Sequence, residues 1–168
     1  MHKQEYETCL HGATMAYKDD PRICLRGMLD GLHAKAVLYA IQAKEQGDET
    51  LSGQIQQIAV MALALIQAEY NHELPQLPLL DGKTEEQIHE ASHFPKQVYG
   101  VDHFFPTVET GYKIALLNVL RTEIRDCERQ AVAVYKNEFP TFIQALNRLS
   151  SYAYCLMCEQ KAKQEVER

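Results

Sequence analysis

Apolar residues recur at intervals of three and four along most of the chain, and this spacing limits the fold more than any other feature. It predicts long amphipathic helices over residues 22–47, 50–70, 107–137 and 139–165. Pro21 and Pro140 stand where helices begin, and Gly47 stands where one ends. Residues 4–17 are predicted as a further short helix, and the chain shows no alternating strand pattern. We therefore expect an all-α fold, an up-and-down bundle of four to five helices in a single domain, residues 1–168.

Residues 71–106 differ from the rest because four prolines and two glycines interrupt them. Thr84, followed by Gln87 three residues later, predicts a capped short helix that ends near Ser92. Loops of this length in a small domain are usually functional or disordered, and this one is rich in histidine and aromatic residues. We expect a partly ordered loop that folds over another part of the structure or a partner rather than a mere linker, and a solvated charged tail over residues 160–168.

Composition narrows the class of protein. The 168 residues include 17 Lys and Arg against 23 Asp and Glu, a net charge of −6 that disfavours nucleic acid as a partner. No stretch approaches the uninterrupted apolar length of a membrane span, and the first residues lack the pattern of a secretory signal. The odd number of cysteines, five, argues against a disulfide framework. These features predict no membrane and a cytoplasmic location.

Two pairs of residues have a spacing that is compatible with a metal. Cys155 and Cys158 form a CxxC within a helical segment, which we interpret as buried thiols on successive turns, with metal or redox chemistry as the alternative. His89 and His93 lie four residues apart and could share a metal on a regular helix, although spacing supplies no third ligand. The identity of any metal therefore stays unknown at this stage.

Three arginines follow one another at intervals of four in the predicted helix 107–137. Arg121, Arg125 and Arg129 would form one stripe about 12 Å long. Each guanidinium group keeps its charge and can bind two oxygens, so this stripe matches a polyphosphate. Glu128 could hold one of the guanidinium groups in place. The alternative is a solvated face with intrahelical ion pairs.

Polar residues also interrupt apolar stretches elsewhere. Asp30 stands between two leucines, where a buried carboxylate would need an arginine from another helix or subunit. Asn147 also stands among leucines and is either a functional amide or an exposed residue. His103, Phe104 and Phe105 form an apolar cluster that could approach a large flat ligand.

Several separated motifs resemble the ATP:corrinoid adenosyltransferase family. The segments LRTEIRDCERQAVAVY and IQALNRLSSYAY are similar to its arginine-rich helix and to the LNRLSD helix that follows. The upstream segments DPRICLRGMLDGLHAK and SHFPKQVYGVDHFFP are most similar to its ethanolamine-utilization branch. The resemblance covers about residues 19–160 and implies a five-helix bundle that forms a homotrimer, with ATP bound between subunits.

The resemblance also implies roles for the nucleotide-site residues. Arg121, Arg125 and Arg129 would bind the ATP phosphates, and Arg125 and Arg129 would act on the departing triphosphate. Glu128 would be their supporting acid, and Asn147 would contact the nucleotide.

Other residues would serve the interface and the second substrate. The resemblance implies that Asp30 pairs with Arg125 across subunits. Phe104 or Phe105 would pack against the corrin and displace its lower axial ligand, with His103 as a neighbour in the corrinoid site.

The implied reaction transfers the 5′-deoxyadenosyl group of ATP, with Mg²⁺, to the cobalt of a reduced corrinoid and releases triphosphate. A reductase or a corrinoid-dependent enzyme would be a partner. Asp126 stands where the family has an arginine, Ser151 replaces an acid, and no phosphate-wrapping loop precedes residue 19. These departures favour an alternative, a catalytically impaired corrinoid- or nucleotide-binding protein of the same fold. A third hypothesis is a helical scaffold without a small-molecule ligand.

Overall fold

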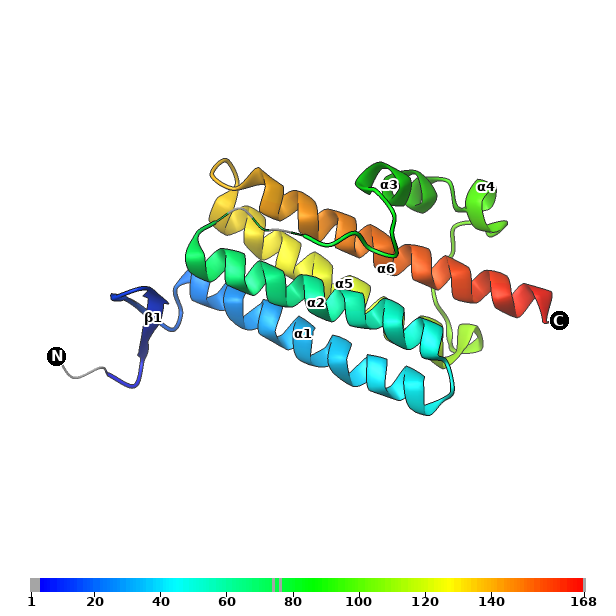
Figure 1. The fold of residues 1–168 in the computed structure, drawn as a ribbon, viewed down its shortest axis with the longest axis horizontal. Coiled ribbons are helices and arrows are strands. Elements are labelled where there is room, and N and C mark those ends of the chain that lie inside the picture. The colour runs from blue at the N-terminus through cyan, green and yellow to red at the C-terminus, as the bar shows by residue number, and fades with distance from the viewer. Residues whose placement is uncertain (1–3, 74, 76, 168) are drawn as a thin grey trace.

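The computed structural model describes residues 4–73, 75 and 77–167, and four long helices dominate it (Figure 1). These helices are α1 (Pro21–Glu45), α2 (Glu49–Asn71), α5 (Gly111–Tyr135) and α6 (Pro140–Val166). The most extensive contacts join α1 to α2 and α5 to α6, and α1 also packs on α5. The all-α helical bundle expected from the apolar periodicity is therefore confirmed.

The order of the helices includes one long crossover. After α2, the chain returns along the length of the bundle before α5 begins, so α2 and α5 run in the same direction (Figure 1). Each of the closely packed pairs, α1 with α2, α1 with α5 and α5 with α6, is antiparallel. The expected up-and-down order therefore holds from α1 to α2 and from α5 to α6 but not across the crossover, although every main contact is antiparallel.

Side-chain caps define where α1 and α2 begin. Asp20 accepts a hydrogen bond from the Arg22 amide at 2.8 Å, and Pro21 occupies the first turn of α1. Asp48 accepts from the Leu51 amide at 3.0 Å at the start of α2. Partial burial opposes ionisation of Asp48, but hydrogen bonds from Lys113 and from this amide outweigh it and hold the pKa of Asp48 below its ordinary value.

Helix α2 is the most apolar of the four long helices. Within the described part of the chain, it is the one helix whose length and composition would allow it to cross a membrane. However, 56% of that apolar window is buried inside the bundle, and the core helix of a bundle meets the same criterion. Its apolar character is explained by its contacts with α1 and α6.

The connection between α2 and α5 is partly helical. It contains α3 (Glu85–His93), α4 (Pro95–Tyr99) and the short 3₁₀ helix η1 (Val108–Thr110). The predicted capping box is confirmed, because the Thr84 hydroxyl accepts from the Gln87 amide while the Gln87 side chain accepts from the Thr84 amide. Helix α3 packs on α6, so this connection covers one side of the bundle instead of hanging free.

The short helix predicted over residues 4–17 is wrong. This segment forms an antiparallel hairpin of β1 (Glu7–His11) and β2 (Thr14–Tyr17) beyond the end of the bundle where α1 begins (Figure 1). Gly12 occupies the turn with a φ of +53°, a conformation that glycine adopts without strain. The hairpin has only two strands, too short a pattern for period-two alternation to be visible in the sequence.

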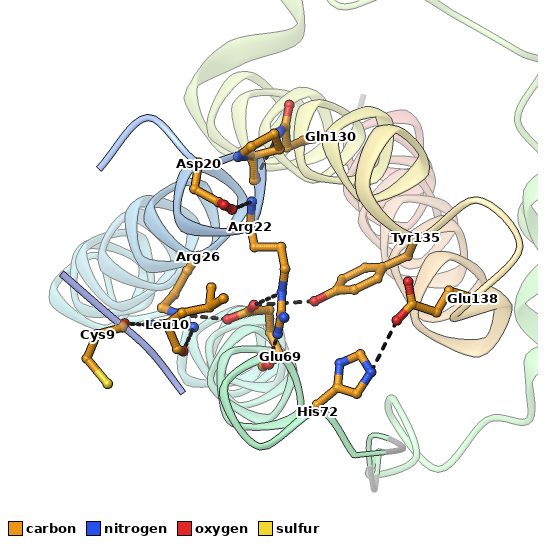
Figure 2. A network of polar contacts seen from close by, with 11 residues as sticks. Cys9, Leu10, Asp20, Arg22, Arg26, Glu69, His72, Gln130, Tyr135 and Glu138 are labelled. Atoms are coloured by element: carbon orange, nitrogen blue, oxygen red, sulfur yellow. Dashed lines mark hydrogen bonds and ion pairs between the residues drawn. The ribbon is translucent and has the colours of Figure 1, made fainter. Parts of the chain in front are cut away.

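A buried carboxylate ties this hairpin to the bundle (Figure 2). Glu69 of α2 is fully buried, and its two carboxylate oxygens lie 3.1 Å from Arg22 Nε and 2.6 Å from Arg26 Nε. The Tyr135 hydroxyl donates to the same carboxylate at 3.3 Å. Arg26 also donates to the carbonyl oxygens of Cys9 at 3.0 Å and Leu10 at 2.6 Å. One acid therefore organises α1, α2, α5 and, through Arg26, the hairpin.

Replacing Glu69 with glutamine should lower the free energy of unfolding by about 3 kcal/mol, because two largely buried guanidinium groups would lose their counter-ion. Urea denaturation measures this change. Glu138→Gln is the matched control, since Glu138 is exposed and its ion-pair partner at 3.2 Å, His72, is exposed as well. Equal unfolding free energies for the two variants would contradict a central role for Glu69.

Candidate functional site

Helix α5 carries the arginine stripe, and its three members have different surroundings. Arg121 is partly buried, and its Nε donates to Asn118 at 3.0 Å. Arg125 is exposed, and Arg129 forms an ion pair with Asp126 one turn earlier. The intrahelical pairing considered for this face is thus realised at Arg129, whereas Arg121 contacts a neutral amide.

Partial burial also affects the electrostatics of Arg121. Desolvation, followed by the neighbouring charge of Arg125, lowers the pKa of Arg121 from its ordinary value. Arg121 and Arg125 thus raise the positive potential over the first half of the stripe.

The packing of α5 against α6 joins Glu128 to Asn147. The Asn147 side-chain nitrogen donates to Glu128 Oε1 at 2.9 Å, and Asn147 is partly buried instead of fully exposed. The side-chain oxygen of Asn147, Oδ1, lies 3.5 Å from a guanidinium nitrogen of Arg148. Glu128 had been expected to hold a guanidinium group, but in the structure it orients this amide. The predicted nucleotide residues of the two helices are thus neighbours.

A hollow of about 200 Å³ lies beside the stripe. It is lined by His103, Phe104, Phe105, Pro106, Arg121, Tyr154 and Met157. Phe104 packs on Tyr154 with ring centroids 6.3 Å apart, while Phe105 is 89% exposed. The fold therefore brings the aromatic segment and Arg121 to one hollow, although Phe104 and Arg121 are far apart in the sequence.

The structure corrects the expected environment of Asp30. The buried stripe of α1 consists of residues such as Leu25, Leu29 and Leu32, whereas Asp30 is exposed. The reason is helical geometry, because a residue adjacent to Leu29 is turned by about 100° from the stripe. Asp30 therefore does not require a partner within one chain, and its pairing with the exposed Arg125 of another subunit stays a prediction.

The two histidines of α3 have partners within the protein. Their ring centroids are 4.0 Å apart, His93 Nδ1 lies 2.9 Å from the His89 carbonyl oxygen, and His89 Nδ1 lies 2.9 Å from a guanidinium nitrogen of Arg148. Desolvation, then the charges of His93 and Arg148, lower the pKa of His89. Within residues 4–73, 75 and 77–167, no group of three or more His, Cys, Asp or Glu could hold a metal ion.

The CxxC cysteines are buried thiols, as the first interpretation of the sequence held. Cys155 and Cys158 are 1% and 0% exposed, and Cys127 on α5 is 1% exposed. Burial raises the pKa of Cys127 and of Cys158 to about 12, and it also raises the pKa of Cys155. These groups are poor nucleophiles at neutral pH because the thiolate form is rare.

Sequence reasoning missed two residues of consequence. Tyr154 faces the hollow from α6, and the one available signal was its place at the end of the LNRLSSYAY motif. Glu69 was also missed, because a single acid at the end of an apolar helix gives no sign of burial. Both residues depend on contacts between distant helices.

The structure is thus a helical bundle in which Arg121 and the Phe104–Phe105 segment line one hollow. Residues 3–160 match the cobalamin adenosyltransferase family, so the chain belongs to this family. It is 32% identical to the corrinoid adenosyltransferase EutT of Escherichia coli (strain K12) over 167 residues. It is equally identical to the enzyme of that name from Salmonella typhimurium (strain LT2) over 166 residues.

These relatives confirm both the predicted family and its ethanolamine-utilization branch. Each alignment covers 96% of this chain and 61% of the relative, so the chain spans about three fifths of the length of the curated relatives it matches. No solved structure shows significant similarity to the chain.

The thiol environments lead to a testable order of reactivity. At pH 8, Cys24, which is exposed, and Cys9, which is half-buried, should react with an aromatic disulfide reagent well before the three buried thiols. Absorbance of the released thiolate measures the number of fast groups. Cys24→Ser should remove one fast equivalent, and Cys158→Ser should remove none. Rapid reaction of Cys155 or Cys158 in the folded protein would contradict the buried-thiol interpretation.

Proposed function

We propose that the chain transfers the 5′-deoxyadenosyl group of ATP to the cobalt of a reduced corrinoid and releases triphosphate. Membership of the cobalamin adenosyltransferase family supports this reaction class. The single structural observation that carries the proposal is the hollow shared by Arg121 and the Phe104–Phe105 segment. In this proposal Arg121 binds phosphate and the aromatic segment faces the corrin, so the two substrates meet at this hollow.

In this proposal the cobalt(I) electron pair attacks C5′ of the ribose, and the C5′–oxygen bond breaks with its electron pair leaving on triphosphate. Arg121, Arg125 and Arg129 bind the negative charge of the leaving group. Glu128 orients the Asn147 amide toward the nucleotide. The aromatic side chains exclude water from the lower face of the corrin, and holding both substrates together supplies much of the rate. The reaction requires no protein nucleophile.

Mg²⁺ enters as the counter-ion of ATP. The described residues do not form a cluster of carboxylates that would hold the ion by themselves. Mg²⁺ commonly retains waters and binds through substrate phosphates, which suits delivery with the nucleotide. We also place the protein in the cytoplasm, with a reductase or a corrinoid-dependent enzyme as its partner.

The proposal includes a homotrimer with nucleotide sites between subunits. Asp30 on α1 and Arg125 on α5 are both exposed in the single chain. Opposite charges on two exposed helix faces support the pairing of Asp30 with Arg125 of a neighbouring subunit. The pair would then hold the stripe at the subunit boundary.

The reaction is tested with Mg-ATP and chemically reduced cobalamin, following formation of adenosylcobalamin by its absorbance. Arg129→Ala should raise the KM for ATP about tenfold or more with an unchanged KM for corrinoid, because a charge-assisted contact to phosphate is lost. Lys136→Ala removes an exposed cation just beyond α5 and is the matched control. Corrinoid binding without any product in the wild-type protein would instead favour the catalytically impaired binding protein.

The subunit pair is tested by charge exchange. Asp30→Arg and Arg125→Asp should each shift the trimer toward smaller species, because like charges would face each other, and the double exchange should restore the trimer. Light scattering during gel filtration, without nucleotide, measures the mass. Glu86→Arg, an exposed charge reversal on α3, is the control. A double variant no better assembled than the singles would argue against this pair.

A further inference from the structure

The segment over residues 103–106 crosses the hollow without belonging to a helix or a strand. Its backbone therefore lacks the regular hydrogen bonds that hold α3 and α6 in place. The ring of His103 connects it to both helices, because Nδ1 lies 3.0 Å from the Tyr154 hydroxyl and Nε2 lies 3.2 Å from the carbonyl oxygen of His93. Both ring nitrogens are thus occupied, although the residue is exposed.

These two contacts define the tautomer of the neutral ring. A carbonyl oxygen only accepts hydrogen bonds, so Nε2 must carry the proton that it donates to His93. Nδ1 is then unprotonated and accepts from the Tyr154 hydroxyl. Burial and the neighbouring Cys158 raise the pKa of Tyr154 to about 12, so the hydroxyl keeps its proton at neutral pH.

Tyr154 also supports the aromatic segment by packing. Its ring is stacked on that of His103, with ring centroids 5.8 Å apart and ring planes 12° apart. The ring centroids of Tyr154 and Phe104 are 6.3 Å apart. Tyr154 and Arg121 line the same hollow. A single side chain of α6 therefore fixes two consecutive residues of the segment.

Helix α3, whose residue His93 accepts the hydrogen bond from His103, is itself held against α6. His93 ends α3, and Arg148 of α6 holds α3 through His89 Nδ1 at 2.9 Å. Arg148 directly follows Asn147, which binds Glu128. The His93 carbonyl that His103 contacts thus belongs to a helix that is held against α6 next to Asn147.

We propose that His103 and Tyr154 are positioning residues of the corrinoid site, which lock Phe104 and the backbone that precedes Phe105 in place between α3 and α6 before the ligand arrives. This inference rests on the proposed function. An aromatic segment that is already ordered loses less conformational entropy when the flat ligand binds. The lock therefore strengthens corrinoid binding and leaves the affinity for the nucleotide unchanged. Neither residue takes part in the chemical step.

Tyr154→Phe tests the lock because it removes one hydroxyl and keeps the ring. It should weaken binding of cob(II)alamin about five- to tenfold, measured by absorbance titration, with the Kd for Mg-ATP unchanged. His103→Ala should weaken it further, while His103→Gln, which retains a donor for the His93 carbonyl, should recover part of the affinity. Tyr17→Phe, on the exposed ring of the hairpin, is the matched control.

The outcomes separate this inference from the proposed function. If the Tyr154→Phe and His103→Ala variants both bind cob(II)alamin as tightly as the wild-type protein does, the lock is overturned and the proposed function stays intact. A wild-type protein that binds no corrinoid would overturn the proposed function, and the lock with it. A readout without ligand covers variants that fail to fold: ¹⁵N NMR of the wild-type protein should show His103 as the Nε2–H tautomer. The Nδ1–H tautomer would overturn the lock.

Discussion

The antiparallel packing of α5 against α6 is the contact on which the candidate site depends. It places Asn147 within hydrogen-bonding distance of Glu128, and it brings Tyr154 to the hollow that Arg121 lines. Each helix alone carries only half of these groups. A long, continuous apolar face stabilises the pair, because the buried residues of both helices interlock along most of their lengths. The polar residues at the edge of this face then have fixed neighbours.

The long crossover between α2 and α5 gives the site its second component. It returns the chain to the end where α5 must begin and lays α3 on α6 as it does so (Figure 1). The aromatic segment follows directly and is held by His103 between the two helices. A short connection would leave α5 and α6 packed but would not bring an aromatic segment beside Arg121. The length of this loop thus allows α3 and residues 103–106 to cover one side of α6.

The opposite end of the bundle is organised by a buried charge. Glu69 is stable there because two guanidinium groups and the Tyr135 hydroxyl replace the water that it loses on burial (Figure 2). Arg26 uses its remaining donors on the carbonyls of the hairpin. The position of β1 and β2 is thus coupled to the core through hydrogen bonds, with little apolar burial of its own.

The sequence by itself determined the elements whose signals are local. The four long helices follow from apolar periodicity, and the cap of α3 follows from Thr84 and Gln87, because both signals depend on neighbours within a few residues. The family was also evident from the motifs around Arg121 and Asn147. The tertiary structure alone decided that Asp30 is exposed, that Glu69 is buried among arginines and that His103 reaches Tyr154. Those facts depend on side chains brought together from distant positions, and no local pattern encodes which faces of two helices will meet.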